Sequence, residues 1–447
     1  MLALLATLSH SLMRPRGYFR ELSHRDFPIS TFDQKIDHAH PEIGVFTQRY
    51  IEEKKYNKNN EVVFLCIGGE SDGFYPYGVN DFVEELAQEQ NAIILTLEHR
   101  YFGESHPFEN TSTPLLQFLT VQNAIDDLAN FRNYYAQKNQ IPDNATWILF
   151  GGSYPGLLSA FTRSQYPNLF KGAIASSGVV LASNDYKEFD LQIAISLGQE
   201  CAAVARNARR RIDELLESDD RDWLLQQFDA SNVEVDVFRF VVGEMFSLAP
   251  QYGYRNQVCG PLLDSLTSGS DPVMALAKYA REFFIPKFCG GSIYETYSTA
   301  RMQSISKVNA GSRMWLWMTC NELAYWQVSP GRLGLRSSKV DQAFFSKQCK
   351  DVFGIEMFPD TDAFNEKYHG LKQDATNVYY TTGSQDPWTP VCITDQETVP
   401  SGSYAHTITG PEVGHCSDLH ASKESDPVDL KRTHAHIKKI IDNWIHE

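Results

Sequence analysis

Residues 147–156 read Trp-Ile-Leu-Phe-Gly-Gly-Ser-Tyr-Pro-Gly, and this stretch decides which fold the chain is expected to adopt. An apolar run of strand type ends at two glycines and a serine, and an apolar stretch with helical spacing follows. A strand, a tight turn, a serine and a helix form a nucleophile elbow, in which the serine hydroxyl and the next N–H face the same space. Gly151 and Ser153 fit the pattern Gly-x-Ser-x-Gly, but Pro155 takes the second glycine position and Gly156 follows one residue late. The stretch therefore fits an elbow or a plain glycine-rich turn, and the rest of the chain has to decide.

Apolar runs on both sides of this stretch predict further strands of one sheet. Residues 61–67 and 92–98 are almost continuously apolar, which is typical of strands buried on both faces, and residues 172–176 form a shorter run. Helical patterns at 81–90 and 122–138 lie between them. Strands that alternate with helices predict a mostly parallel sheet with helices on both faces, the α/β class.

The pattern changes near residue 185. From there to about residue 305 the strand signals vanish and helical patterns dominate, which predicts an all-helical insertion where such sheets usually carry a lid. Strands are expected to resume at 314–318, 378–382 and 405–409, before a last helix at 427–446.

The expected organisation is an α/β-hydrolase fold interrupted by a helical cap domain. Its first part covers residues 30–184, the cap covers 185–305, and the second part covers 306–447. Residues 1–20 are apolar but lack a basic start, so they are interpreted as a truncated signal segment or as a frayed apolar terminus.

Three residues far apart in the chain each follow a predicted strand: Ser153, Asp386 and His415. Their order is that of α/β-hydrolases, and open α/β sheets place their ligand sites at these strand ends. A serine hydroxyl needs an imidazole as general base, and a carboxylate must orient that imidazole. The sequence therefore predicts Ser153 as nucleophile, His415 as base and then acid, and Asp386 as the orienting group. A lone Asp-Pro or Gly-His is usually a turn, but three matching positions favour the catalytic interpretation.

Residues 68–73, Gly-Gly-Glu-Ser-Asp-Gly, form a glycine-rich loop after the strand at 61–67. The loop is either a plain turn or the second half of an oxyanion hole. In the second case the N–H groups of Tyr154 and Gly69 would hold the oxyanion. The loop lacks the Gly-Lys-Ser/Thr ending of a phosphate loop.

Composition limits the partners and the compartment. A formal charge of −16 argues against a nucleic-acid partner, and no run of about 20 apolar residues predicts a membrane span. The histidines and the eight cysteines show no metal-ligand spacing, so no metal or cofactor is expected. The sequons at Asn110 and Asn144 point to the secretory route, where disulfides become common.

With these motifs the chain resembles the family of lysosomal Pro-X carboxypeptidases, dipeptidyl peptidase II and thymus-specific serine peptidase. The likeness spans nearly the whole chain, and the cysteine beside His415 resembles the thymus-specific branch. It rests on residues 32–38 (Phe-Asp-Gln-Lys-Ile-Asp-His), 48–50 (Gln-Arg-Tyr), 98–105 (Glu-His-Arg-Tyr-Phe-Gly-Glu-Ser), 151–156, 319–322 (Thr-Cys-Asn-Glu), 386–388 (Asp-Pro-Trp) and 415–419 (His-Cys-Ser-Asp-Leu).

The resemblance implies a lysosomal, vesicular or secreted serine exopeptidase whose helical insertion restricts the cleft to chain ends, often next to proline. Ser153, Asp386 and His415 match the family's triad. Peptides are the expected substrates, and a homodimer is a candidate assembly. The candidate substrate contacts are Leu157, Tyr325, Trp388 and Glu70. Pro155 departs from the family's common glycine, and Tyr325 and Leu157 depart from the methionines of the carboxypeptidase branch.

Within this resemblance, spacing suggests disulfides between Cys320 and Cys349, between Cys392 and Cys416 and between Cys259 and Cys289, with Cys66 left outside them. Two other functions stay open. A lipase or esterase would use the same triad, and a catalytically inactive binding protein would keep only the fold. Whether dipeptides leave from the amino end or single residues from the carboxyl end depends on which charged group closes the cleft.

Overall fold

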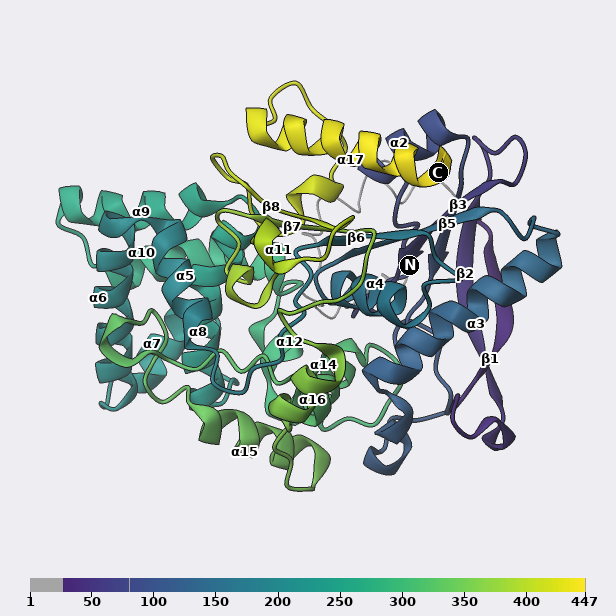
Figure 1. Ribbon diagram of the computed structural model, residues 1–447. Helices are drawn as coiled ribbons and strands as arrows, with labels where there is room; N and C mark the ends of the chain where they lie inside the picture. Colours follow the sequence, from purple (N-terminus) through teal and green to yellow (C-terminus); the bar gives the residue numbers. More distant parts are fainter. Residues whose placement is uncertain (1–26, 80, 447) are drawn as a thin grey trace, which may run out of the picture.

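The computed structural model describes residues 27–79 and 81–446, and the expected signal segment at 1–20 lies outside these residues. One eight-stranded sheet runs through the molecule in the order β1-β2-β4-β3-β5-β6-β7-β8 (Figure 1). Its strands are β1 (Ile29–Lys35), β2 (Val45–Glu53), β3 (Val62–Ile67), β4 (Ile93–Leu97), β5 (Thr146–Gly152), β6 (Gly172–Ser176), β7 (Val378–Gly383) and β8 (Tyr404–Ile408).

The sheet is parallel from β4 to β8, and its other edge is antiparallel, where β2 pairs with β4 and with β1. The strands β3, β4 and β6 are buried along their whole length, as their apolar runs predict. Helices α3 (Val121–Asn139) and α4 (Tyr154–Gln165) cover one face, and α2 (Phe82–Gln90) and α17 (Val428–His446) cover the other (Figure 1). This is the α/β-hydrolase fold that the sequence predicts.

Between β6 and β7 the described chain forms helices and turns without a strand of the sheet. Six helices pack as a group beside the sheet, drawn in blue-green to teal in Figure 1. They are α5 (Lys187–Leu197), α6 (Gln199–Leu216), α7 (Arg221–Gln227), α8 (Val235–Gln251), α9 (Arg255–Ser268) and α10 (Pro272–Tyr279). Further helices follow: η3 (Ala280–Phe284), α11 (Ile285–Phe288), α12 (Ile293–Tyr297), α13 (Thr299–Met302), α14 (Gly311–Met318), η4 (Thr319–Leu323), η5 (Gly331–Leu333), α15 (Gln342–Phe353) and α16 (Thr361–Tyr368).

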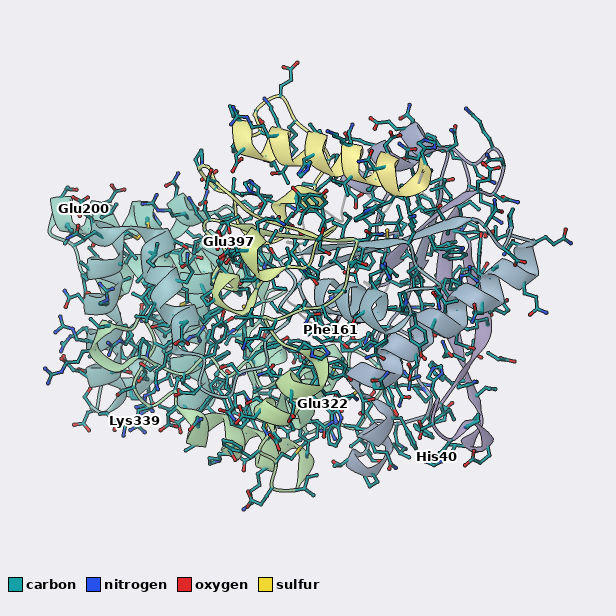
Figure 2. All side chains as sticks on the ribbon, viewed as in Figure 1. His40, Phe161, Glu200, Glu322, Lys339 and Glu397 are labelled. Atoms are coloured by element: carbon teal, nitrogen blue, oxygen red, sulfur yellow. A yellow bond between two sulfur atoms is a disulfide. The ribbon has the colours of Figure 1, made fainter. Side chains whose placement is uncertain are left out.

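The last of these helices pack back on the hydrolase part of the chain. Phe161 of α4 stacks on Tyr368 of α16, with ring centroids 4.8 Å apart (Figure 2, where Phe161 is labelled). A stacked aromatic pair of this kind adds to the free energy gained by burying both rings. The helical region is thus continuous with the core beneath the sheet.

The strand expected at 314–318 is wrong, because these residues belong to helix α14. Along α14 the buried residues Met314, Trp317 and Met318 recur with helical spacing, whereas Trp315 and Leu316 are half-buried. An apolar run of five residues does not distinguish a buried strand from a buried helix, and here tertiary packing selects the helix.

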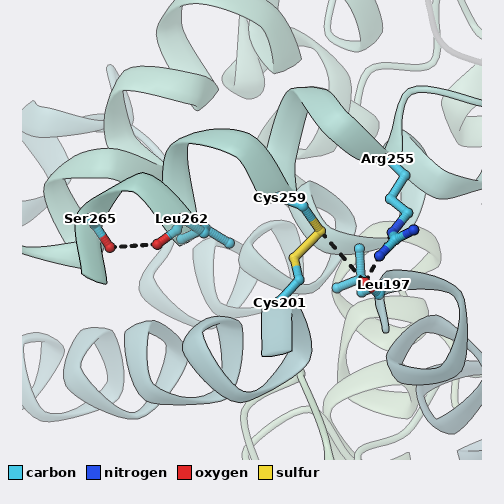
Figure 3. The surroundings of a disulfide bond; sticks show 6 residues. All are labelled: Leu197, Cys201, Arg255, Cys259, Leu262 and Ser265. Atoms are coloured by element: carbon cyan, nitrogen blue, oxygen red, sulfur yellow. Dashed lines mark hydrogen bonds between the residues drawn. A yellow bond between two sulfur atoms is a disulfide. The ribbon is translucent and has the colours of Figure 1, made fainter. Parts of the chain in front are cut away.

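The described residues contain two disulfides, one of which was expected. Cys320 is joined to Cys349, which confirms that pair. Cys259 is joined to Cys201, so the expected bond from Cys259 to Cys289 is wrong (Figure 3). The expected bond between Cys392 and Cys416 is also wrong, since both remain thiols, as does Cys289. Helix packing explains this, because α6 and α9 bring Cys201 and Cys259 to a Cα–Cα distance of 5.5 Å.

Candidate active site

Ser153 lies at the tip of a sharp turn between β5 and α4. Its backbone has φ 66° and ψ −128°, a conformation that non-glycine residues rarely adopt. A methyl group on Gly151 would overlap the Pro155 carbonyl, and one on Gly156 would lie 2.9 Å from the Ser176 carbonyl oxygen on β6. Pro155 is the second residue of α4, where no backbone N–H is needed. The turn therefore accommodates the proline, and Gly156 provides the close helix–strand approach.

Asp386 and His415 follow β7 and β8, and their side chains meet. The two groups are buried, and His415 Nδ1 lies 2.7 Å from Asp386 Oδ2. The other carboxylate oxygen accepts a hydrogen bond from the Trp388 N–H at 2.9 Å. In the neutral imidazole Nδ1 donates to the carboxylate and Nε2 carries the lone pair, and Nε2 has no hydrogen-bond partner within the described residues.

Ser153 and His415 line the same small cavity of about 50 Å³, together with Tyr252 from the end of α8. Burial acts to lower the pKa of His415, but the charge of Asp386 and the hydrogen bond to it outweigh burial. The pKa of His415 is therefore raised above its usual value. The arrangement provides an oriented imidazole with a free nitrogen beside a serine.

The two candidate oxyanion donors follow the ends of neighbouring parallel strands, β5 and β3. Tyr154 is the first residue of α4, where a backbone N–H has no partner within the helix. Gly69 is buried just after β3, which pairs with β5 in parallel. The preceding Gly68 donates its N–H to Leu97 O at 2.8 Å, and this bond fixes the loop against β4. The carboxyl ends of β3 and β5 thus bring both loops to one edge of the sheet.

Aromatic rings form a wall beside His415. The Trp388 ring centroid is 6.4 Å from that of His415 and 5.5 Å from that of Tyr325. Trp315 of α14 continues the wall at 6.3 Å from Tyr325. Of the residues predicted for the substrate pocket, Trp388 and Tyr325 come together here and Leu157 lies on α4. All three side chains are buried in the main core.

Sequence reasoning missed Trp315, Gln251 and Tyr252. The assignment of 314–318 to a strand hid Trp315, whose ring faces Tyr325 only because the segment is a helix. Gln251 and Tyr252 lie at the end of a helix predicted as part of the cap, and no motif marks them. Their position beside the candidate site becomes visible only in the folded structure, where that helix end packs against the loop of His415.

Glu70 contributes a buried carboxyl group to this region. Its side chain is completely buried, and neither oxygen has a hydrogen-bond partner in another described residue. Burial raises the pKa of Glu70 to about 7, although its own backbone N–H and the charge of His415 act to lower it. A buried carboxyl group with unused hydrogen-bonding capacity next to His415 is a candidate contact for a charged ligand.

The neighbouring charged residues of the motif at 98–105 are part of the scaffold, as the sequence favours. Glu98 accepts a hydrogen bond from Arg49 Nε at 2.8 Å. Arg100 is completely buried and binds Asp127 through Nε at 2.7 Å. His99 Nε2 accepts a hydrogen bond from the Tyr154 hydroxyl at 3.0 Å, since its Nδ1 lies 2.8 Å from the Arg100 carbonyl oxygen.

The chain is similar to known serine peptidases along most of its length. A family model described as Serine carboxypeptidase S28 matches residues 34–437. The probable serine protease EDA2 of Arabidopsis thaliana is 32% identical, over 95% of this chain and 88% of that protein. The thymus-specific serine protease of Mus musculus is 26% identical, over 90% and 84%. The lysosomal Pro-X carboxypeptidase of Bos taurus is 26% identical, over 94% and 88%. The family model covers most of the chain, and the chain therefore belongs to the serine carboxypeptidase S28 family.

Proposed function

We propose that this chain is a serine exopeptidase that cleaves short peptides through an acyl-enzyme on Ser153. The observation that carries the proposal is the 2.7 Å contact between His415 and Asp386, with the free Nε2 of His415 in the cavity that Ser153 also lines. Ser153 on its strained turn is the only serine of that cavity lining within the described residues.

The reaction follows from these positions. Nε2 of His415 takes the hydroxyl proton as Ser153 Oγ attacks the peptide carbonyl carbon. The N–H groups of Tyr154 and Gly69 stabilise the negative charge on the carbonyl oxygen. The imidazolium, stabilised by Asp386, then protonates the leaving amine and the C–N bond breaks. Water then attacks the acyl carbonyl carbon while His415 takes one of its protons, the ester bond to Ser153 Oγ breaks, and His415 returns the proton to Oγ. No step requires a metal or a cofactor.

We assign the substrate's proline ring to the wall of Trp388 and Tyr325. A flat apolar surface suits a pyrrolidine ring, and this wall adjoins the catalytic imidazole. The helical segment is proposed to cover the cleft, because Tyr252 at the end of α8 lines the cavity with Ser153. A covered cleft accepts chain ends more readily than chain interiors.

Glu70 is the proposed contact for the charged end of the substrate. Among the described residues, no lysine or arginine lines the cavity beside Ser153. The lining includes Asp81, and Glu70 lies outside the lining but interacts with the charge of His415. Ionised Glu70 complements an α-ammonium group, and this charge balance favours release of dipeptides from the amino end. Product analysis on one unblocked peptide with proline at position 2 decides between the two ends: a released dipeptide supports this assignment, and a single residue lost from the carboxyl end contradicts it.

An oxidising vesicular, lysosomal or extracellular compartment is proposed for the chain. Its two disulfides are typical of such compartments, and the sequon at Asn144 lies on an exposed turn. Asn110 is half-buried and its amide oxygen accepts a hydrogen bond from the Ser112 N–H at 3.0 Å, which makes it the less accessible sequon. Within the described residues no helix is long and apolar enough to cross a membrane.

Labelling with a fluorophosphonate probe tests the proposed nucleophile. The native protein should form one covalent adduct, and Ser153→Ala should form none while keeping its circular dichroism spectrum. Absence of an adduct on the native protein, or equal labelling of the variant, would exclude the catalytic role and favour a binding protein. Turnover of a proline-containing dipeptide amide against a fatty ester separates a peptidase from a lipase or esterase.

A further inference from the structure

The helical segment makes direct contacts with both loops that carry Asp386 and His415. The junction of α8 and α9 holds the His415 loop, since the carbonyl oxygen of Gln251 accepts the His415 N–H at 2.7 Å. A methyl group on Gly414 would overlap that same carbonyl, so the two segments touch backbone to backbone. The Tyr252 ring lies edge-on to the His415 ring, with centroids 6.4 Å apart.

The loop of Asp386 is held from the same side. The Ser196 hydroxyl, near the end of α5, donates a hydrogen bond to Gln385 O at 3.0 Å, and the Tyr186 hydroxyl donates to Pro387 O at 3.2 Å. Gln251 contacts this loop as well, because its Oε1 accepts a hydrogen bond from Trp388 Nε1 at 3.3 Å. Gln251 is completely buried and therefore joins the acid loop and the base loop through one residue.

The Cys201–Cys259 disulfide joins the two helix corners that make these contacts (Figure 3). Cys201 lies in the first turn of α6, directly after α5, and Cys259 lies in α9, shortly after the α8–α9 junction. Beside the disulfide, Arg255 Nε donates a hydrogen bond to Leu197 O, the last residue of α5, at 2.9 Å. One covalent bond and one hydrogen bond thus fix the spacing between the corner that holds Asp386 and the corner that holds His415.

We propose that Gln251 is a positioning residue of the catalytic site, and that the Cys201–Cys259 disulfide keeps the α5 and α8–α9 corners in the spacing that aligns His415 with Asp386. The inference rests on the proposed peptidase function. A displacement of about 1 Å in a catalytic group lowers a rate by about 100-fold, so a small change in this spacing is sufficient to affect catalysis.

The test compares two variants, each lacking one disulfide, with the wild-type chain. Cys201→Ala with Cys259→Ala should lower kcat per active site by about 10-fold or more and change KM by less than about 3-fold. Cys320→Ala with Cys349→Ala, which removes the other disulfide, is the matched control and should keep kcat per active site. Active sites are counted by fluorophosphonate titration. Equal kcat in the Cys201 and Cys259 variant and the wild type would overturn the role of the disulfide.

Gln251→Leu is the second variant and keeps the backbone contact to His415 while removing the acceptor for Trp388. It should lower kcat with little change in melting temperature, and wild-type kcat would overturn the role of Gln251. If the disulfide variant does not fold, Gln251→Leu still tests whether the contact between the helical segment and the catalytic loops affects kcat.

Hydrogen exchange gives a readout independent of activity. The backbone amides of residues 384–388 and 412–416 should exchange faster in the disulfide variant than in the wild type, and unchanged exchange would contradict the inference. A wild type that forms no fluorophosphonate adduct refutes the peptidase function instead, and the exchange result still decides the positioning role.

Discussion

At the scale of single residues, Ser153 combines a strained backbone with a chemical role. The conformation at φ 66° costs free energy that the surrounding strands and helix have to supply. We expect Ser153→Ala, and equally His415→Ala, to lower kcat by about 10⁴-fold or more on a dipeptide amide while the fold persists. Steady-state kinetics with circular dichroism as the control checks this. Residual activity within tenfold of the wild type would contradict the assigned roles.

Glu70 predicts a dependence of stability on pH. Its pKa is about 7 in the folded chain and 4.5 ordinarily, so between these values the folded state holds a proton that the unfolded state releases. The free energy of unfolding therefore falls as pH rises from about 4.5 to about 7, by up to about 3 kcal/mol from this group.

In Glu70→Gln this contribution should disappear. Urea denaturation at pH 4.5, 6 and 8 gives the free energy of unfolding of the variant and of the wild type, and the difference between the two at each pH measures the contribution of Glu70. The exposed Glu397 provides the matched control in Glu397→Gln, which should follow the wild type at each pH. If the free energy of unfolding changes with pH in the same way for Glu70→Gln and the wild type, burial of Glu70 does not contribute to the pH dependence of stability.

At the scale of elements, the elbow depends on how closely α4 approaches the end of β5. A methyl group on Gly151 would overlap the backbone of Pro155, so Gly151→Ala forces the helix away from the strand. We expect a loss of about 2–4 kcal/mol in the free energy of unfolding, or no folded protein.

The control for that substitution lies in α9. Gly260 is inside the helix directly before Pro261, and outside its chain neighbours a methyl group there would meet no atom within 4 Å. Gly260→Ala should therefore change the free energy of unfolding by no more than about 1 kcal/mol, because the gain in helix propensity opposes the crowding of the methyl group against Pro261. Equal effects of the two substitutions in thermal denaturation would refute the argument from close approach.

Elements differ in how well the sequence predicts them. The strands β3, β4, β5 and β6 were predictable because a parallel strand buried on both faces has a continuous apolar run. Helix α14 was not predictable, because five consecutive apolar residues fit a buried strand and a buried helix equally well. Which of the two forms depends on contacts with residues that are distant in the sequence. The candidate triad residues could be named from the sequence because each follows a predicted strand, whereas the places of Gln251 and Trp315 depend on tertiary packing.

At the scale of the whole molecule, the surface gives a further prediction. Of the two sequons, the one at Asn144 is exposed and the one at Asn110 is half-buried. Secretion of the chain from a eukaryotic host should yield a glycan at Asn144, and Asn144→Gln should remove the mass that peptide N-glycosidase releases. Glycan only at Asn110 would contradict the exposure argument, and an unmodified secreted chain would contradict the proposed route.

The disulfides show why whole-molecule features are harder to predict than motifs. Spacing along the chain identified Cys320 and Cys349, which lie on adjacent elements, but it paired Cys259 with the wrong partner. The correct partner, Cys201, is 58 residues away and becomes a neighbour only when α6 and α9 pack together. The packing of these helices also places Gln251 against the loop of His415, so both features depend on contacts between segments that are distant in the sequence.

The position of the helical segment between β6 and β7 has a consequence for biosynthesis. Asp386 and His415 come more than 230 residues after Ser153 in the chain, and the strands that they follow, β7 and β8, pair in turn beside β6. A nascent chain therefore contains Ser153 without its proposed partners until translation has passed these residues.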